Sequence, residues 1–351
     1  MVRRSLIAVA LFAVAAPLAA QSPVAQPEEW TWSLNRPDAL APIGVFGARA
    51  MEKGELQVSY RYQQTNWEGT YYQTDSLPLL DVLVLYDDAP ITRRDLRHRV
   101  RVEYGITDRL SLLARGEWAV IQRQTFSNGA PIRVGIESLG DVELGVLYQA
   151  YAQGPYRMIL QGGAIIPTGH AVTYADTTRA GVGPDVVLPY DMRPGGGTFA
   201  AIGGVTGTVQ NEVGSLGIQF RVRADFGMNG VGSTPDARGY RLGQQYEANG
   251  WAAYKVNSVF SVSAGVRWEN WRQIEGSDDR LYTFGDPHNW ASQLSGQRAH
   301  MPLGVNMLMP GNSVLAGHRI GAEMVYTLHH NYDAPQMGMD WGFNLGYFIS
   351  F

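Results

Sequence analysis

Hydrophobic and polar residues alternate with a period of two through most of the chain after residue 54. In residues 215–226, for example, apolar side chains at the even positions alternate with Arg221 and Arg223 at odd positions. Successive side chains of a β-strand point to opposite faces, so this alternation predicts strands with one apolar and one polar face. Twelve such segments are found at residues 55–63, 96–104, 110–120, 142–150, 156–166, 198–209, 215–226, 246–255, 259–269, 303–309, 318–328 and 341–351.

The connections between the predicted strands are short and long in turn. Residues 106–109 and 256–258 are short connections, whereas 64–95, 121–141 and 329–340 are long ones. Each strand has about the length of a tilted membrane-spanning strand, and short periplasmic turns with long outer loops are typical of bacterial outer-membrane barrels. We therefore predict an all-β fold, a transmembrane antiparallel up-and-down β-barrel of about 12 strands. A soluble sandwich or propeller is the alternative, but aromatic residues near the strand ends favour the barrel.

Composition removes several other classes of protein. The chain has 351 residues and no cysteine, which excludes disulfides and thiolate sites. Its formal charge of −4 argues against a nucleic-acid partner. Charged residues make up 17% and hydrophobic residues 45% of the chain, yet no internal apolar run is long enough for a membrane helix.

The chain is predicted to begin with an export signal. Arg3 and Arg4 precede a short apolar stretch, and small residues lead to a cleavage site near Ala20. We therefore expect a signal peptide at 1–20, an N-terminal periplasmic or plug segment at 21–54, and the transmembrane barrel at 55–351. The expected location is the outer membrane. Trp30 and Trp32 favour docking of the N-terminal segment over a disordered leader.

Charged residues of the predicted strands share one parity, opposite the apolar face. Because a charge at a lipid-facing midplane costs about 2–4 kcal/mol, this parity is assigned to the lumen. The predicted lumen-lining residues are Arg61, Arg97, Arg99, Arg101, Glu103, Arg115, Glu117, Glu143, Arg221, Arg223, Asp225, Glu247, Arg267, Glu269, Arg319 and Glu323. With Glu55 and Asp340 they make nine arginines and nine carboxylates, a nearly neutral interior. Such charges either line a wet channel or pair with one another and fill a narrow lumen.

Three short motifs resemble a known family. They are Ser138-Leu139-Gly140-Asp141, Pro167-Thr168-Gly169 and Gly195-Gly196-Gly197-Thr198. They resemble the "G-L-G-D … L-P-T-G" and "G-S-G-T" signatures of the outer-membrane barrels named for the phenol meta-cleavage degradation pathway, although Ser138 replaces the first Gly. The resemblance implies uptake or efflux of small hydrophobic or aromatic compounds.

A narrower, uncharacterised subgroup of that family is resembled as well. The segments Arg36-Pro37-Asp38 and Gly239-Tyr240-Arg241-Leu242-Gly243 look like its recurring segments. Ala48-Arg49 stands where the subgroup suggests an Asp-His pair, so no metal is expected at that position.

The C-terminal strand resembles the signal read by the barrel-assembly machinery. Its alternating residues are Phe343, Leu345, Tyr347, Ile349 and Phe351. The resemblance implies that the secretion translocon and the assembly machinery act on this chain during biogenesis. Outer-membrane lipids and a small-molecule solute are the other expected partners, and the barrel is expected to be a monomer.

Enzyme chemistry finds little support in the pattern. A lipase-like site needs a Ser and a His within hydrogen-bond reach, and the lumen-facing Ser261 and Ser263 have no His on their strand. His329, His330 and Asp333 could hold a transition ion only loosely, because adjacent side chains of an extended chain point apart. We therefore expect a non-enzymatic channel for passive diffusion without cofactor or metal. The alternatives are a barrel-based hydrolase or metal-binding surface protein, and a sealed structural barrel.

Overall fold

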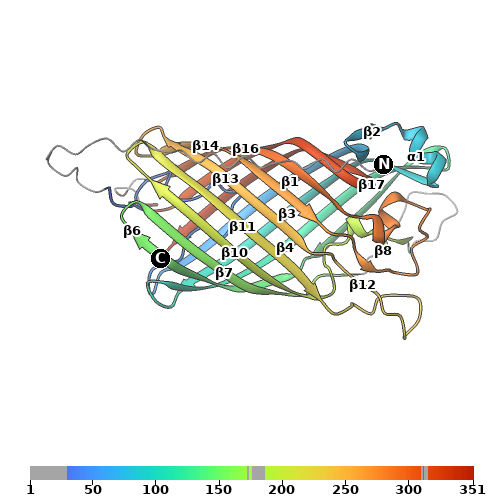
Figure 1. Ribbon diagram of the computed structural model, residues 1–351, viewed down its shortest axis with the longest axis horizontal. Coiled ribbons are helices and arrows are strands. Elements are labelled where there is room, and N and C mark those ends of the chain that lie inside the picture. The colour runs from blue at the N-terminus through green and yellow to red at the C-terminus, as the bar shows by residue number, and fades with distance from the viewer. Residues whose placement is uncertain (1–29, 172–173, 176–185, 310, 312–314) are drawn as a thin grey trace, which may run out of the picture.

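The computed structural model describes residues 30–171, 174–175, 186–309, 311 and 315–351, and within them the chain forms a closed antiparallel β-barrel (Figure 1). The main sheet has thirteen strands, and pairing of its first strand with its last closes a ring of eleven. The predicted signal peptide lies outside the described residues. The strands of the ring are β1 (Leu56–Gln73), β3 (Asp88–Gly105), β4 (Leu110–Ser127), β6 (Val142–Gln153), β7 (Tyr156–Ile166), β10 (Phe199–Gln210), β11 (Gly214–Phe226), β13 (Gln245–Lys255), β14 (Phe260–Trp271), β16 (Gly296–Leu308) and β17 (Arg319–Ser350).

The predicted all-β closed barrel is confirmed, but the count of about 12 strands is not. The predicted strands 318–328 and 341–351 both fall within β17, a single run of 32 residues. The part of β17 up to Tyr332 pairs with β16, and the part from Tyr332 to Ser350 pairs with β1. Residues 329–340, predicted as a loop, are strand because their backbone stays paired although their side chains no longer alternate.

Two other predicted loops also contain strand. β1, β3 and β4 continue well past the predicted ends, and β2 (Asp75–Leu77) and β5 (Ala130–Leu139) pair with β1 and β4 outside the ring. The β4–β5 hairpin turns at Asn128 and Gly129, whose φ angles of 48° and 79° suit a tight turn. The predicted boundaries were wrong here because strands above the apolar band need not alternate.

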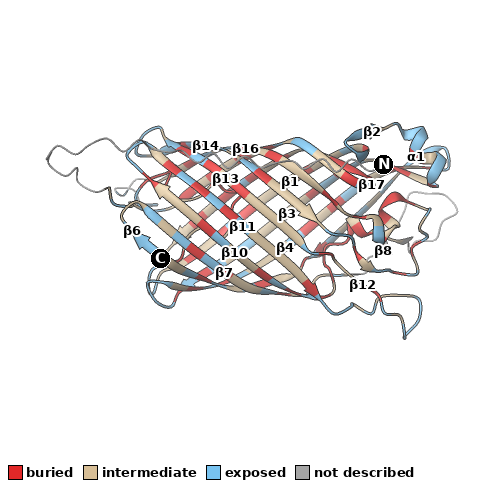
Figure 2. Ribbon diagram, viewed as in Figure 1, coloured by how far each residue is buried: buried red, intermediate tan, exposed pale blue. Residues whose placement is uncertain are grey.

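Exposed and buried positions alternate along the strands of the barrel wall (Figure 2), and the exposed positions are mostly apolar whereas many of the buried ones are polar. Exposed outward residues include Tyr60, Val100, Leu112, Leu144, Ile218 and Val266. Buried inward residues include Arg61, Ser111, Glu143, Gln219, Arg267 and Glu323. This distribution is the reverse of a soluble protein and suits a barrel surrounded by lipid. Among the described residues, no helix is long and apolar enough to cross a membrane.

The two ends of the barrel differ. Short turns join the strands at the end where the C-terminus lies, and the small elements gather at the opposite, long-loop end (Figure 1). The small elements are α1 (Leu79–Leu85), β8 (Tyr174–Ala175), β9 (Val186–Val187), η1 (Tyr190–Met192), β12 (Tyr240–Arg241), β15 (Glu275–Gly276), η2 (Pro287–Asn289) and η3 (Ala291–Gln293).

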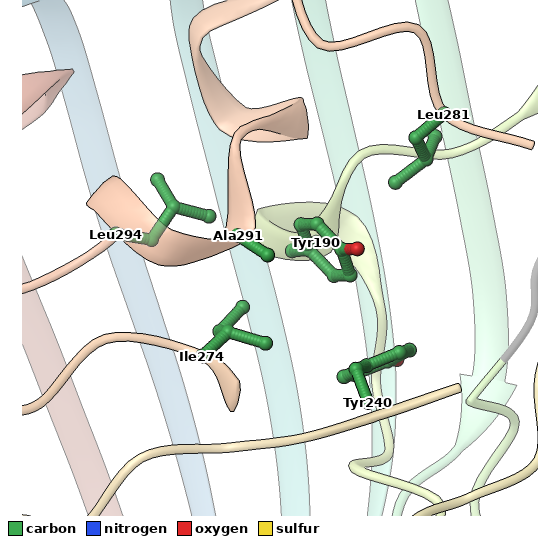
Figure 3. Close-up of a cluster of buried hydrophobic side chains, with 6 residues drawn as sticks. All are labelled: Tyr190, Tyr240, Ile274, Leu281, Ala291 and Leu294. Carbon is green, nitrogen blue, oxygen red and sulfur yellow. The ribbon is translucent and has the colours of Figure 1, made fainter. Parts of the chain in front are cut away.

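A buried apolar cluster joins three of the long loops. Its members are Tyr190, Tyr240, Ile274, Leu281, Ala291 and Leu294 (Figure 3). The rings of Tyr190 and Tyr240 meet edge to face, with centroids 4.8 Å apart. These loops therefore form a packed unit, which we call the loop cap: the described residues of 186–198, 227–244 and 272–295.

Candidate functional site in the barrel lumen

Residues 30–54 run inside the short-turn end of the barrel. The Trp32 backbone N–H donates to the Gly154 carbonyl at 3.1 Å, in the turn between β6 and β7. The Ser261 hydroxyl donates to the Pro37 carbonyl at 3.0 Å, and the Ser215 hydroxyl donates to the backbone carbonyl of Asp38 at 2.6 Å. A segment without helix or strand needs such partners for its backbone, and the inward polar residues of the wall supply them.

The segment then passes close to the charged wall. The Gly44 N–H donates to a Glu323 carboxylate oxygen at 3.3 Å, and the side-chain amide of Gln219 donates to the Phe46 carbonyl at 2.5 Å. Five guanidinium groups surround the Phe46 ring, at 3.9 Å (Arg61), 5.9 Å (Arg99), 5.8 Å (Arg101), 5.1 Å (Arg115) and 5.7 Å (Arg221) from its centroid. Phe46 thus occupies a strongly cationic environment, stabilised by cation–π attraction.

A cavity of about 480 Å³ lies beside Phe46 in the lumen. Its lining comes from the N-terminal segment and from β1, β3, β4, β7, β10, β11, β13, β14, β16 and β17. The charged residues of the lining are Arg61, Arg99, Arg115, Arg221, Arg223, Arg267, Arg298, Glu247 and Glu269. Its aromatic residues are Phe46, Tyr246 and Trp271.

Each of the sixteen residues predicted to line the lumen is buried or half-buried, and eight of them line this cavity. The other eight are Arg97, Arg101, Glu103, Glu117, Glu143, Asp225, Arg319 and Glu323, and most of them pair along the wall. Arg97 and Arg99 both pair with Glu117, and Arg115 lies 2.5 Å from a Glu143 oxygen. Further pairs are Arg101–Glu103 at 3.1 Å, Arg221–Glu143 at 3.6 Å, Arg223–Asp225 at 2.8 Å and Arg267–Glu323 at 3.7 Å.

Arg319 and Glu247 have other partners. Arg319 donates to the Arg36 and Pro37 carbonyls at 3.3 and 3.5 Å, and Glu247 accepts from Asn249 at 2.6 Å. The predicted balance of nine arginines and nine carboxylates therefore does not describe the cavity. Its lining carries seven guanidinium groups against two carboxylates, because most of the pairing carboxylates lie outside it.

A second charged cluster, under the loop cap, was not predicted. The Asp191 carboxylate forms ion pairs with Arg93 at 2.7 Å and with Arg123 at 3.1 Å, and Arg123 also pairs with Asp286. Burial alone would raise the pKa of Asp191, but His288, Arg123 and Arg93 lower it well below its usual range. The pKa of Asp286 is lowered as well, since Arg123 and His288 outweigh burial.

The sequence held only part of the signal for this cluster. Arg93 and Asp95 continue the parity of Arg97, so extending that strand by four residues would have placed them in the lumen. Asp191 and Asp286 lie in irregular loops, where no periodicity marks a side chain as inward. The residues of the N-terminal segment, Phe46 included, gave no periodic signal either.

The three family-like motifs meet at one point. Both oxygens of the Asp141 carboxylate accept backbone N–H groups at 3.0 Å, one from Gly169 and the other from Gly196. The Thr168 hydroxyl donates to the Gly140 carbonyl at 3.2 Å. A Cβ at Gly169 would lie 2.8 Å from the Gly140 carbonyl carbon, so the close approach requires glycine. Asp141, directly before β6, thus ties together the segment after β7 and the segment before β10.

Of the two serines considered as nucleophile candidates, Ser261 has a structural partner. Ser261 is fully buried and donates to Pro37, and Ser263 is buried on the same strand. A different pair, Ser138 and His170, lies within hydrogen-bond distance, at 2.8 Å between Oγ and Nδ1. This pair was not predicted, because β6 and β7 separate the two residues along the chain.

The predicted His–Asp loop lies within β17. His330 stacks on Tyr332 with ring centroids 5.2 Å apart, and Asp333 accepts a hydrogen bond from Ser295 at 2.5 Å. In the part of the chain that the structure describes, no three His, Cys, Asp or Glu side chains are placed to hold a metal ion.

Four of the C-terminal residues predicted as an assembly signal alternate along β17, and the fifth, Phe351, follows its last residue. Leu345 and Phe351 are exposed, whereas the intervening Asn344 is buried. Phe351 and Leu56 exchange two backbone hydrogen bonds, at 2.8 and 3.1 Å, where the ring closes.

Solved structures share this fold. No protein-family model matches the chain, and no curated protein sequence matches it. The COG4313 outer membrane channel from Pseudomonas putida F1 aligns with a TM-score of 0.57 at 12% identity, over 88% of this chain and 99% of that chain. The P. putida toluene transporter TodX aligns with a TM-score of 0.44 at 10% identity, over 86% of this chain and 91% of that chain. A Pseudomonas aeruginosa FadL homologue aligns with a TM-score of 0.42 at 11% identity, over 90% of this chain and 93% of that chain.

The first of these comparisons establishes the fold. The chain has the architecture of a porin-like outer-membrane β-barrel. The family named for the phenol pathway is not confirmed by these comparisons and stays a prediction.

Proposed function

We propose that this protein is a channel through which small solutes, hydrophobic and aromatic compounds among them, cross the outer membrane by passive diffusion. The observation that carries the proposal is the cavity of about 480 Å³ inside the barrel, between the N-terminal segment and the loop cap. Small-molecule sites have volumes of about 300–1,000 Å³, so the cavity has room for one such solute. The similar fold of the COG4313 outer membrane channel supports the same function.

The proposed channel has twelve membrane crossings, two of them within β17. An extended strand of 32 residues would span about 105 Å, far more than the roughly 30 Å of a bilayer core. Asn344 donates to Glu323 at 2.9 Å, although the two residues are 21 positions apart in β17. This contact supports a strand that folds back on itself, so the chain crosses an even number of times, as bacterial barrels do.

The proposed biogenesis rests on two segments, residues 1–20 and the C-terminal strand. Residues 1–20 are removed after export, the assembly machinery recognises the C-terminal strand, and a monomer inserts among outer-membrane lipids. The outward apolar face supports this location, because it would otherwise be exposed to water.

We propose that residues 21–54 act as a plug in the lumen. The described part, residues 30–54, is held by hydrogen bonds between its backbone and wall side chains, and by the burial of apolar side chains such as Ala50 against the wall. Each such bond contributes only about 1 kcal/mol net, because water can replace either partner. A solute can therefore displace the plug without unfolding the barrel.

Conductance across planar bilayers tests this function. The full-length protein is expected to give small, intermittent currents, and liposomes containing it should swell in solutions of permeant solutes. Replacing both Ser215 and Ser261 by Ala should lengthen the open intervals, since two contacts of the plug are lost. If neither the wild-type protein nor the double variant gives current or swelling, the barrel is a sealed structural one instead.

A hydrolase is the second candidate, favoured by the 2.8 Å contact between Ser138 and His170. This pair has the separation expected of a nucleophile and its base. Release of fatty acid from phospholipid vesicles would reveal the activity, which should disappear in Ser138→Ala and persist in Ser261→Ala. Lack of release by the folded wild-type protein would eliminate this candidate.

A further inference from the structure

The cavity is far more basic than the rest of the lumen. Seven guanidinium groups line it, and only Glu247 and Glu269 contribute carboxylates. Glu269 is already engaged by Arg298 at 2.6 Å, and Glu247 by Asn249 at 2.6 Å. Arg99, Arg115 and Arg223 pair with Glu117, Glu143 and Asp225 from outside the lining, so the least balanced positive charge lies on Arg61, Arg221 and Arg267.

Three of these arginines have guanidinium groups with incomplete pairing. Arg61 is buried over the Phe46 ring and has no ion-pair partner within 4 Å among the described residues. Arg267 is buried, its Nη2 has no hydrogen-bond partner, and the nearest carboxylate oxygen of Glu323 is 3.7 Å away. The Nε of Arg221 likewise has no partner, and its Nη2 lies 3.6 Å from Glu143.

Buried charges without partners are unfavourable, because protein does not replace the hydration that they lose. An anion in the cavity would lie beside these guanidinium groups and partly balance their charge. Carboxylates suit guanidinium groups especially well, since two parallel N–H groups can donate to the two carboxylate oxygens. The attraction is stronger inside the barrel than in bulk water, where the dielectric constant is higher.

The same cavity offers an apolar surface. Ile165 and Ile202 lie on one part of its wall, and Phe46, Tyr246 and Trp271 add aromatic rings. A simple inorganic anion would leave these side chains without a partner. An organic acid with an apolar body would use both kinds of surface.

We infer that the cavity is a binding site for small organic carboxylates with an apolar or aromatic body. The guanidinium groups of Arg61, Arg221 and Arg267 attract the carboxylate, and the aliphatic and aromatic side chains contact the body. This inference rests on the proposed channel function, for which it names the class of solute.

Calorimetric titration of the full-length protein in detergent tests the inference with three ligands of nearly the same shape. Benzoate carries the negative charge, benzamide is neutral, and benzamidine is positively charged. Benzoate is expected to bind at least tenfold more tightly than benzamide, and benzamidine should show no measurable binding. Equal binding of benzoate and benzamide, or no binding of benzoate, would overturn the inference.

Arginine variants locate the site. Arg61→Gln and Arg267→Gln should each weaken benzoate binding about tenfold and leave benzamide binding unchanged. Arg109→Gln is the matched control, because Arg109 is exposed in the turn between β3 and β4 and the same charge is lost. Equal weakening by Arg109→Gln would mean that net charge, and not this cavity, attracts the anion.

The outcomes separate this inference from the function on which it rests. Arg61→Lys and Arg267→Lys keep the charge, so they replace a Gln variant that fails to fold. The three-ligand comparison uses the wild-type protein and needs no variant. Benzoate binding without conductance would contradict the channel and leave the anion site standing. Conductance with equal binding of benzoate and benzamide would contradict the anion site and leave the channel standing.

Discussion

The two ends of the lumen are closed by different kinds of interaction. At the short-turn end, residues 30–54 are held by single hydrogen bonds from the wall, such as those of Ser215 and Ser261, together with a few buried or half-buried side chains such as Ala50 and Phe46. At the long-loop end, an apolar cluster around Tyr240 lies over buried ion pairs centred on Asp191. Single hydrogen bonds exchange readily with water, whereas a packed cluster with buried ion pairs is lost only when several side chains separate together. The comparison suggests that the plug moves and that the loop cap stays folded.

The largest effect is expected from Asp191→Ala in the ion cluster. Arg93 and Arg123 would keep Asp95 and Asp286 but lose this shared carboxylate, which costs up to about 3–5 kcal/mol for a buried pair. Hydrogen exchange should become much faster in 188–192 and 286–290. Asp236→Ala, in an exposed stretch of the same cap, is the control and should change nothing. Unchanged protection in Asp191→Ala would contradict the idea of a rigid cap.

Truncation of the apolar cluster is expected to have the next largest effect. Tyr240 is 1% exposed and its hydroxyl donates to the Ala171 carbonyl at 3.0 Å. Tyr240→Ala should destabilise the cap by about 3 kcal/mol, as a large buried side chain does when it is removed. Tyr282→Ala is the matched control, since Tyr282 is 63% exposed in the same cap. Limited proteolysis of the cap loops is measured for both variants. Equal cleavage rates would show that the apolar cluster does not hold these loops together.

Acid should loosen the cap by a smaller amount. The folded pKa values of Asp191 and Asp286 lie below the ordinary value of about 3.9, so the unfolded form takes up protons first as the pH falls. The stabilisation is therefore complete above about pH 4 and declines as the pH falls toward the folded pKa values. Proteolysis by an acid protease should accelerate below pH 4 and stay constant between pH 5 and 7. Acceleration already between pH 7 and 5 would contradict the assignment of this effect to Asp191 and Asp286.

The smallest effect is expected at the plug. Ser261→Ala removes one hydrogen bond to Pro37, and the free energy of plug release should fall by about 1 kcal/mol. A change of about 1.4 kcal/mol alters an equilibrium constant tenfold, so the open fraction in bilayers should rise about fivefold. Ser76→Ala, an exposed serine outside the ring, is the control. A larger effect at Ser261 than at Asp191 would reverse the comparison between the two ends.

Much of the barrel wall could be predicted from alternation alone. Ten of the twelve predicted segments each lie largely within a separate strand, and the parity of Arg61, Glu143 and Arg267 placed each of them inward. The reason is local: a side chain on a strand has only two faces, and lipid tolerates only apolar ones. Errors appeared where that constraint ends, as at 121–141 and 329–340.

The cavity and its surroundings were much harder to predict. The parity of Glu117 and Glu143 placed them inward together with their arginines, but it could not show that these carboxylates pair along the wall and lie outside the cavity lining. Phe46 and Asp191 lie in segments without regular structure, so their positions depend on contacts with residues far away in the chain.

The sequence by itself determined the barrel, the direction in which its strands face, and the charged character of the lumen. These properties follow from a period of two and from the cost of exposing charge to lipid, and both operate on neighbouring residues. The tertiary structure alone decided how the ring closes, what occupies the lumen, and which charges remain for a solute. Those depend on pairing across the whole chain, because Leu56 meets Phe351 and Ser261 meets Pro37 only when every strand between them has been placed.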